Sequence, residues 1–424
     1  MSNTELFEFI KKSPDAYHAV ENIKTRLISA GYTEISECDL SAFSDGGAHF
    51  VVRGGSSVIA FRGSTDGGFM ITASHSDNPS FKVKENVASG AYAKLNTEKY
   101  GGMILYSWLD RPLSVAGRVT VRTRDGIASR LVNIDRDYAL IPSVAIHLNR
   151  GVNDGYKFNP ATDMLPLTGI SGKASLMADI AKLLGVGECD IISHDLHLYN
   201  REEPRAVGGD GELILSPRID DLGCVWAALE GFLTVDKAPS GVSVLAVFDN
   251  EEVGSSTKQG ANSTFLADTL RKIAGNEGKY YQMLSDSYMV SCDVAHAKHP
   301  NHPELSDSVG APTLGGGVAV KYNANQSYTT DSVSDGIIRT VAERCGAKLQ
   351  SFYSRADMPC GSTLGSISDT RVSVSSVDIG IPQLAMHSAT ETAAAADIDG
   401  MISLLKELYS STLAVCGDEV KILK

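Results

Sequence analysis

Two adjacent carboxylates, Glu251 and Glu252, directly follow a short apolar run and have the residue types for metal and proton chemistry. The run, residues 243–248, reads S-V-L-A-V-F and is typical of a buried parallel strand. In open α/β sheets, ligands gather just beyond the carboxyl ends of the strands. Because neighbours in sequence point in different directions, one carboxylate can bind a metal while the other transfers a proton. Taken alone, such a pair is more often a solvated acidic turn.

Three other apolar runs also end in a residue that can bind a metal, namely His75, Asp293 and His387. Asp77 lies two positions after His75, so on extended backbone the two side chains share a face. A carboxylate in that position can fix the tautomer of an imidazole and aim its other nitrogen at a metal. Each residue alone also has an ordinary explanation, since Asp77 could be a turn residue and His387 a satisfied core histidine.

A fifth candidate, Asp220, opens a helix that we predict to run to about residue 235. Helix N-terminal N–H groups favour a carboxylate, so Asp220 or the following Asp221 could equally be a helix cap. If the four apolar runs are neighbouring strands of one sheet, their ends converge. Two imidazoles and three carboxylates then suit a pair of dications bridged by one carboxylate and one water. Crowded carboxylates repel one another unless a metal neutralises them, which favours the metal hypothesis.

Composition narrows the class of protein. The chain has 424 residues, of which 43% are hydrophobic and 21% charged, as in a globular protein with a sizeable core. The net charge of −13 argues against a nucleic-acid partner. No apolar run approaches a membrane span, and the first residues do not have the pattern of a secretory signal. Seven scattered cysteines without a C-x-x-C pair favour reduced thiols, so we expect a cytoplasmic protein without a membrane partner.

The chain divides by character into an α/β framework and an insert. Residues 84–212 alternate β-like stretches with Gly- and Asn-rich connectors and are too long to be a loop in a compact domain. We therefore expect a catalytic domain in two parts, residues 1–83 and 213–424, interrupted by a second domain. Among the predicted helices, one spans residues 175–184 and another, at about residues 392–415, closes the chain.

Together these motifs resemble the aspartyl aminopeptidase family of two-zinc metallopeptidases, in an arrangement similar to its bacterial members. The resemblance covers nearly the whole chain and includes the insert, through Y-G-G, W-L-D-R and I-P-S-V-A-I-H-L. The motifs of the framework that carry it, in chain order, are S-H-S-D-N-P, S-P-R-I-D-D-L, F-D-N-E-E-V-G-S-S, S-C-D-V-A-H-A, D-M-P-C-G-S-T-L-G and P-Q-L-A-M-H-S. The fold that the resemblance implies is a mixed-sheet α/β/α zinc-peptidase catalytic domain with an inserted β-rich dimerisation domain.

The resemblance implies two zinc ions per subunit, for which cobalt or manganese can substitute, and an aminopeptidase activity on peptides. A zinc-bridging water would attack the peptide bond, and the free N-terminus of the substrate would occupy a metal position. By motif position, His75 and Asp293 would bind one zinc, Glu252 and His387 would bind the other, and Asp220 would bridge both. Glu251 would be the general base, and Asp77 would orient His75.

The resemblance also implies roles outside the metal ligands. His147 matches a histidine that reaches a neighbouring subunit's site and stabilises the oxyanion, and Lys321 matches a position that pairs with an acidic first residue. Lys321 could instead be a surface lysine. The family typically forms a dodecamer built from dimers, with its active sites facing an inner chamber that admits peptides. The middle of the Trp108 motif and the short stretch between Asp293 and Lys321 depart from the family pattern and put the specificity in doubt.

Three alternatives remain open. The same chemistry could serve neutral or hydrophobic first residues. A related two-zinc fold could act as a carboxypeptidase or deacylase. Finally, the chain could be a catalytically inert shell or cargo protein, although all five implied ligands and Glu251 are present.

Overall fold

The largest sheet of the protein has nine strands and is mixed. The computed structural model describes residues 3–89, 91–170, 175–235 and 240–424. The four central strands β13, β4, β14 and β18 run parallel, so their carboxyl ends meet at one edge. In spatial order the strands are β1 (Thr33–Glu34), β2 (His49–Arg53), β3 (Ser57–Ser64), β13 (Gly241–Phe248), β4 (Phe69–His75), β14 (Tyr288–Cys292), β18 (Ser375–Gly380), β16 (Val318–Tyr322) and β17 (Leu349–Tyr353).

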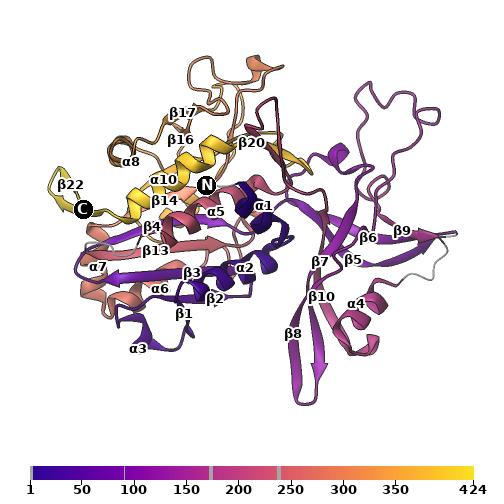
Figure 1. Cartoon of the computed structure of the whole chain (residues 1–424), viewed down its shortest axis with the longest axis horizontal. Helices are drawn as coiled ribbons and strands as arrows, with labels where there is room; N and C mark the ends of the chain where they lie inside the picture. Colours follow the sequence, from indigo (N-terminus) through magenta and orange to yellow (C-terminus); the bar gives the residue numbers. More distant parts are fainter. Residues whose placement is uncertain (1–2, 90, 171–174, 236–239) are drawn as a thin grey trace.

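Helices cover both faces of this sheet, which explains the apolar sequences of its central strands. Every residue of β4 and β13 is buried, because neither face meets solvent. The resulting three layers confirm the predicted α/β/α class (Figure 1). One face packs against α1 (Asn3–Lys11), α2 (Ala16–Ser29), α5 (Ile219–Leu233), α8 (Ser332–Cys345) and α10 (Ala395–Tyr409), and the other against α6 (Phe265–Ala274), α7 (Glu277–Ser285) and α9 (Leu364–Asp369).

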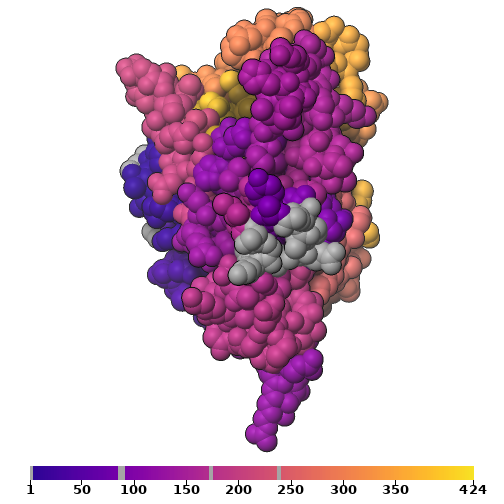
Figure 2. Space-filling model, turned by 90° about the vertical axis from the view of Figure 1, so that its right-hand side faces the viewer, coloured from indigo at the N-terminus to yellow at the C-terminus, as the bar shows by residue number. Residues whose placement is uncertain are grey.

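A six-stranded antiparallel sheet stands beside the three layers (Figure 1) and has a hydrophobic core of its own around Phe81, Trp108 and Leu196. Its β7–β8 hairpin projects away from the body of the molecule, as Figure 2 shows from the side of this sheet. In spatial order the strands are β8 (Gly126–Asn133), β7 (Leu113–Thr123), β10 (Ile191–Asn200), β5 (Ser80–Ser89), β6 (Tyr92–Tyr100) and β9 (Leu167–Ile170), with the helix α4 (Leu176–Leu184) against it.

A smaller five-stranded sheet joins the stretch after β10 to the C-terminal part of the chain. It pairs β12 with β20 and β20 with β19, so residues far apart in sequence become neighbours. Its strands are β11 (Arg205–Val207), β12 (Leu213–Ser216), β20 (Glu391–Ala394), β19 (Pro382–Leu384) and β15 (Ala295–His296).

The end of the chain differs from the prediction of one helix over residues 392–415. The alanine-rich stretch begins as strand β20, the helix α10 ends at Tyr409, and a hairpin of β21 (Thr412–Cys416) and β22 (Glu419–Leu423) follows. Ala393 is buried and pairs with Ile214 of β12, so a tertiary contact overrides the helix propensity of alanine. Within the described ranges, no helix is long and apolar enough to cross a membrane.

Candidate metal centre

Three neighbouring parallel strands deliver side chains to one point at the edge of the large sheet. His75 is the last residue of β4, the Glu251–Glu252 pair lies just beyond β13, and Asp293 follows β14. These strands are adjacent in the order β13-β4-β14, so the expected convergence holds for them. The fourth run is different. His387 follows β19, which belongs to the five-stranded sheet, so the expectation of a single sheet is wrong for this residue.

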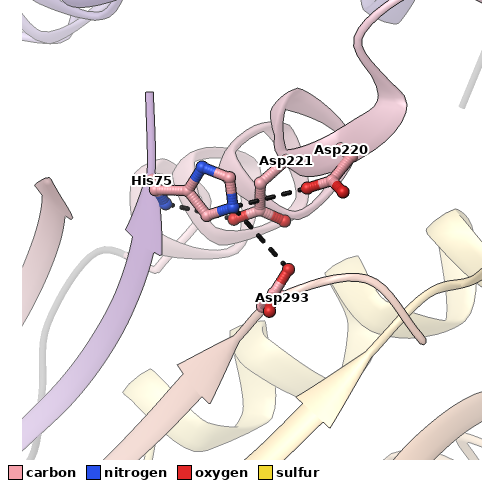
Figure 3. Close-up of side chains that lie close together, drawn as sticks. All are labelled: His75, Asp220, Asp221 and Asp293. Carbon is pink, nitrogen blue, oxygen red and sulfur yellow. Dashed lines mark hydrogen bonds and ion pairs between the residues drawn. The ribbon is translucent and has the colours of Figure 1, made fainter. Parts of the chain in front are cut away.

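Asp220 lies at the start of α5, and its backbone is not helical there. Its φ and ψ are −79° and 107°, and those of Asp221 are −113° and 16°; the peptide bond between them is cis. The Asp220 N–H donates to the buried carboxylate of Glu391, at 3.0 Å. Asp220 is therefore turned out of the helix, and its carboxylate is directed towards the strand ends (Figure 3).

The two oxygens of the Asp220 carboxylate face different imidazoles. Oδ1 lies 3.3 Å from His75 Nε2, and Oδ2 lies 3.2 Å from His387 Nε2. On the first side, Asp293 Oδ1 is 3.7 Å from His75 Nε2 (Figure 3). On the second side, Glu252 Oε2 is 3.5 Å from His387 Nε2. Of the three possible donor groups among the described residues, two share the Asp220 carboxylate: one with His75 and Asp293, the other with Glu252 and His387.

Both imidazoles are held in the tautomer that suits metal binding. His75 Nδ1 lies 3.1 Å from the Asp77 carbonyl oxygen, and His387 Nδ1 lies 2.6 Å from the Gly102 carbonyl oxygen. A carbonyl oxygen only accepts, so each Nδ1 carries the hydrogen. Each Nε2 is then the nitrogen that faces the carboxylates and can bind a cation.

Burial and neighbouring charges make several of these side chains hold protons more tightly than usual. Burial raises the pKa of Glu251 to about 7 and that of Glu252 well above its ordinary value. Burial of Asp220 opposes its ionisation, but the imidazoles of His387 and His75 beside its two oxygens outweigh this and lower its pKa. Burial also disfavours the His387 cation, yet Asp220 and Glu252 raise its pKa to about 10. A dication at this point replaces the protons as the source of positive charge.

The donor set fits zinc. Among the described residues, Asp220 Oδ1 and Glu252 Oε1 are buried without a hydrogen-bond partner, which is costly unless a cation binds there. Imidazole nitrogens and carboxylate oxygens are ordinary zinc ligands, and His75, Asp220 and Asp293 form one possible group of them.

Asp77 contacts more of the centre than its expected partner. Its Oδ1 is 3.4 Å from His75 Nδ1 and accepts the Glu251 N–H at 3.1 Å. Its Oδ2 accepts the Glu252 N–H at 3.2 Å and the Tyr100 hydroxyl at 2.7 Å. This one buried carboxylate thus ties the His75 strand to the turn that carries both glutamates.

Sequence reasoning missed two further residues that hold ligands in place. Glu391 is 2% exposed and accepts the N–H of Asp220 at 3.0 Å and that of His387 at 2.8 Å. Asp221 accepts the His75 N–H at 3.1 Å (Figure 3). A lone acid in the alanine-rich stretch was the only available signal for Glu391, and that stretch suggested a helix.

The remaining predicted site residues lie in different surroundings. Lys321 is buried and lines a pocket of about 190 Å³ beside the ligands, with Nζ 3.4 Å from Asp293 Oδ2. Tyr328 and Phe352 line the same pocket. His147 is exposed and does not line this pocket, so this chain's fold does not bring it to its own metal centre.

Comparison with known proteins agrees with the fold and the donor set. The profile of the family described as "Aminopeptidase I zinc metalloprotease (M18)" matches residues 9–409. A relative from Clostridium novyi, named probable M18 family aminopeptidase 2, is 42% identical, with 96% of this chain and 98% of that protein covered. The chain therefore belongs to the M18 family of zinc metalloproteases, and it is an aminopeptidase, a hydrolase of peptide bonds.

Solved structures of the same fold include relatives of this family. In a cryo-EM structure of the Ape4 and Nbr1 complex, the matching chain has a TM-score of 0.91 and is 34% identical, with 96% of this chain and 85% of that chain covered. The crystal structure of an M18 aminopeptidase from Thermotoga maritima has a TM-score of 0.84 and is 25% identical, with 96% of this chain and 95% of that chain covered. The predicted recognition of a metallo-aminopeptidase is confirmed.

Proposed function

We propose that this aminopeptidase holds two zinc ions per subunit. His75 and Asp293 bind one, Glu252 and His387 bind the other, and Asp220 is shared. The observation that carries the proposal is the Asp220 carboxylate, whose two oxygens lie 3.3 and 3.2 Å from the Nε2 atoms of two different histidines. A carboxylate shared between two donor groups can bridge a pair of neighbouring dications.

In this proposal Glu251 is the general base that removes a proton from the attacking water and returns it to the leaving amine. Zinc ions, when bound, polarise the scissile carbonyl and acidify that water. Glu251 lines the pocket beside the ligands, and burial raises its pKa to about 7, which suits proton transfer near neutral pH. Its backbone N–H donates to Asp77, so its position is coupled to that of His75.

We further propose a preference for an acidic first residue, on the basis of Lys321. Its ammonium is buried in the pocket, 3.4 Å from Asp293 Oδ2 and 5.4 Å from the centre of the Tyr328 ring. Asp293 is also a proposed metal ligand, so its negative charge is shared with the metal and does not fully neutralise the Lys321 ammonium. The ammonium can then pair with a substrate carboxylate. The aromatic rings of Tyr328 and Phe352 support the second candidate, a preference for neutral or hydrophobic first residues.

Assembly through the six-stranded sheet completes the proposal, with residues 84–212 as a dimerisation domain and a dodecamer as the final state. Apolar side chains around His147 are open to solvent: Val144 is 56% and Leu148 is 84% exposed. A second copy would cover them and bring His147 to a neighbouring site, where it can stabilise the oxyanion.

Hydrolysis of a panel of aminoacyl-nitroanilides and short peptides tests the proposal, with Asp, Glu, Leu or Lys as the first residue. Each substrate is assayed with the protein as purified, after chelation, and after zinc, cobalt or manganese is restored. We expect metal-dependent release of Asp and Glu. Metal-dependent release of Leu or Lys instead would keep the chemistry and discard the role of Lys321. No hydrolysis in any metal state would favour the inert-shell alternative.

A further inference from the structure

Three consecutive residues at the end of β6 touch three different parts of the metal centre. They are Tyr100, Gly101 and Gly102, the Y-G-G motif to which the family resemblance assigns no role. All three belong to the chain segment of the six-stranded sheet, whereas the proposed ligands come from the other two sheets and α5. The segment therefore reaches the site from a different sheet than the proposed ligands do.

Tyr100 acts on the side of His75. Its hydroxyl donates to Asp77 Oδ2 at 2.7 Å and accepts from Asn250 Nδ2 at 2.8 Å. Asp77 in turn contacts His75 Nδ1 and accepts the N–H of Glu251. The hydroxyl thus fixes the carboxylate that fixes both the imidazole and the proposed base.

The Tyr100 ring has a separate packing partner, so the hydroxyl and the ring can be tested apart. The ring meets the His197 ring edge-on, with centroids 5.2 Å apart. Removing only the hydroxyl leaves that contact in place.

The two glycines act on the other side of the centre. Gly101 has φ = +77°, and a Cβ added there would lie 3.2 Å from Glu252 Cβ, so its backbone fits closely against this proposed ligand. The Gly102 carbonyl accepts the Nδ1–H of His387 at 2.6 Å. The next turn reinforces this, since the Ile104 N–H donates to the His387 carbonyl at 2.9 Å.

We propose that residues 100–102, at the end of the six-stranded sheet, form a clamp that positions His75, Glu252 and His387 for metal binding. Within this clamp, Tyr100 is a positioning residue that acts through Asp77. The inference rests on the proposed two-metal function and deepens it. Its consequence is that any displacement of the six-stranded sheet changes both halves of the metal centre.

The first test compares Tyr100→Phe with Tyr17→Phe. Tyr17 is a matched control, because its hydroxyl also bridges α2 and the six-stranded sheet, 3.4 Å from Asp195 Oδ2. Zinc affinity is measured by competition with a chromophoric chelator, and the absorption spectrum of the cobalt-substituted protein reports ligand geometry. For Tyr100→Phe we expect a loss of zinc affinity of about 10- to 100-fold and an altered cobalt spectrum. Tyr17→Phe should match the parent in both.

The second test compares Gly101→Ala with Gly185→Ala. Both glycines have positive φ, +77° and +67°, but a Cβ at Gly185 meets nothing within 4 Å. Both variants therefore incur the same kind of backbone strain and should lower the thermal midpoint to a similar extent. Only Gly101→Ala should also weaken zinc binding, by about 10-fold or more, because only there does the new methyl crowd Glu252.

The outcomes separate the clamp from the proposed function. If the parent binds zinc and cleaves peptides while Tyr100→Phe equals it in affinity and spectrum, the clamp is wrong and the proposed function stands. Equal losses in Tyr100→Phe and Tyr17→Phe would also refute the clamp, since any contact that holds the six-stranded sheet in place would then suffice. A parent that binds no zinc overturns both proposals.

Discussion

Asp220 and Glu251 show how neighbouring side chains give two buried carboxylates different tasks. Both lie among the same charged groups, but the two histidines lower the pKa of Asp220 while burial raises that of Glu251 to about 7. Asp220 is therefore ionised and suited to bind cations, and Glu251 is suited to exchange a proton near neutral pH. Residue type alone does not separate these roles; the distances to His75 and His387 do.

The raised pKa of Glu391 makes the stability of the chelated protein depend on pH. Burial and the nearby Asp220 raise its pKa from an ordinary 4.5 to about 8, so the folded state holds its proton more tightly than the unfolded state. The stabilisation is complete below the unfolded pKa and is lost as the pH rises through the folded value. We expect the thermal midpoint of chelated protein to fall between about pH 4.5 and 8.

The measurement is a series of thermal melts in chelator across this pH range, for the parent and for Glu391→Gln. The amide does not titrate. Its one oxygen can accept only one of the two N–H groups, because those of Asp220 and His387 donate to different oxygens of Glu391, so the variant starts from a lower midpoint but lacks this pH dependence. The variant should therefore show a shallower fall. His387, with a pKa raised to about 10, adds a decline of the same sign at higher pH. A parent whose midpoint rises over this range would contradict the prediction.

At the scale of elements, β18 determines where Asp293 lies. Gly380 is the last residue of β18, and a Cβ there would lie 1.9 Å from the Asp293 carbonyl oxygen. No rotamer relieves a clash between Cβ and backbone, so Gly380→Ala must push the ends of β14 and β18 apart. We expect a loss of stability of about 1–3 kcal/mol or more and weaker zinc binding.

Urea unfolding and zinc competition measure the two effects. Gly336→Ala is the control, because Gly336 lies within α8 and a Cβ there meets nothing within 4 Å. This substitution should stabilise the protein by about 0.5–1 kcal/mol and leave zinc affinity unchanged. Unaltered zinc binding in Gly380→Ala would show that Asp293 does not depend on the register of β18.

Elements with strong local signals were predicted well from the sequence. The apolar runs that end at His75, Phe248 and Cys292 are neighbouring strands as expected, because buried parallel strands need such sequences. The helix predicted for residues 175–184 is observed as α4, with Ser175 as its cap.

Features that depend on long-range pairing were not predictable in this way. The strand β20 forms because Ala393 meets Ile214, and this same pairing brings Glu391 beside Asp220. The carbonyl of Gly102 holds His387 through a backbone atom, which no residue type reveals. Only the resemblance to a known family pointed to the Y-G-G motif, and it gave that motif no role.

At the scale of the whole molecule, the six-stranded sheet adjoins both the metal centre and a solvent-exposed apolar surface. One end of it supplies Tyr100 and Gly102 to the metal centre, and its surroundings expose Leu148 and Val144 to solvent. A contact made on the outside of this sheet is therefore connected through a short stretch of chain to the proposed ligands. This connection gives assembly a physical route to affect activity in a chain whose proposed oxyanion residue, His147, lies outside its own site.

Mixed oligomers test whether His147 completes a neighbouring site. Glu251→Gln alone should lower kcat by about 10²- to 10⁴-fold as loss of a general base, and His147→Ala by about 10²- to 10³-fold as loss of an oxyanion donor. When the two variants are produced in one cell, a mixed dimer contains one site with its own Glu251 and the neighbour's His147. A mixed dimer selected for both variants should therefore have about half of the parental activity, because one of its two sites is complete.

Differently tagged subunits, purified through both tags in succession, ensure that only mixed assemblies are assayed. The controls are each variant alone and the two variants combined after separate purification without subunit exchange, which should all stay inactive. If His147 acted within its own chain, no site in a mixed dimer would contain both residues, and activity would stay at the level of the single variants. Recovery in the mixed assemblies therefore means that the catalytic unit of this aminopeptidase is at least a dimer, and that the exposed face around His147 is part of its active site.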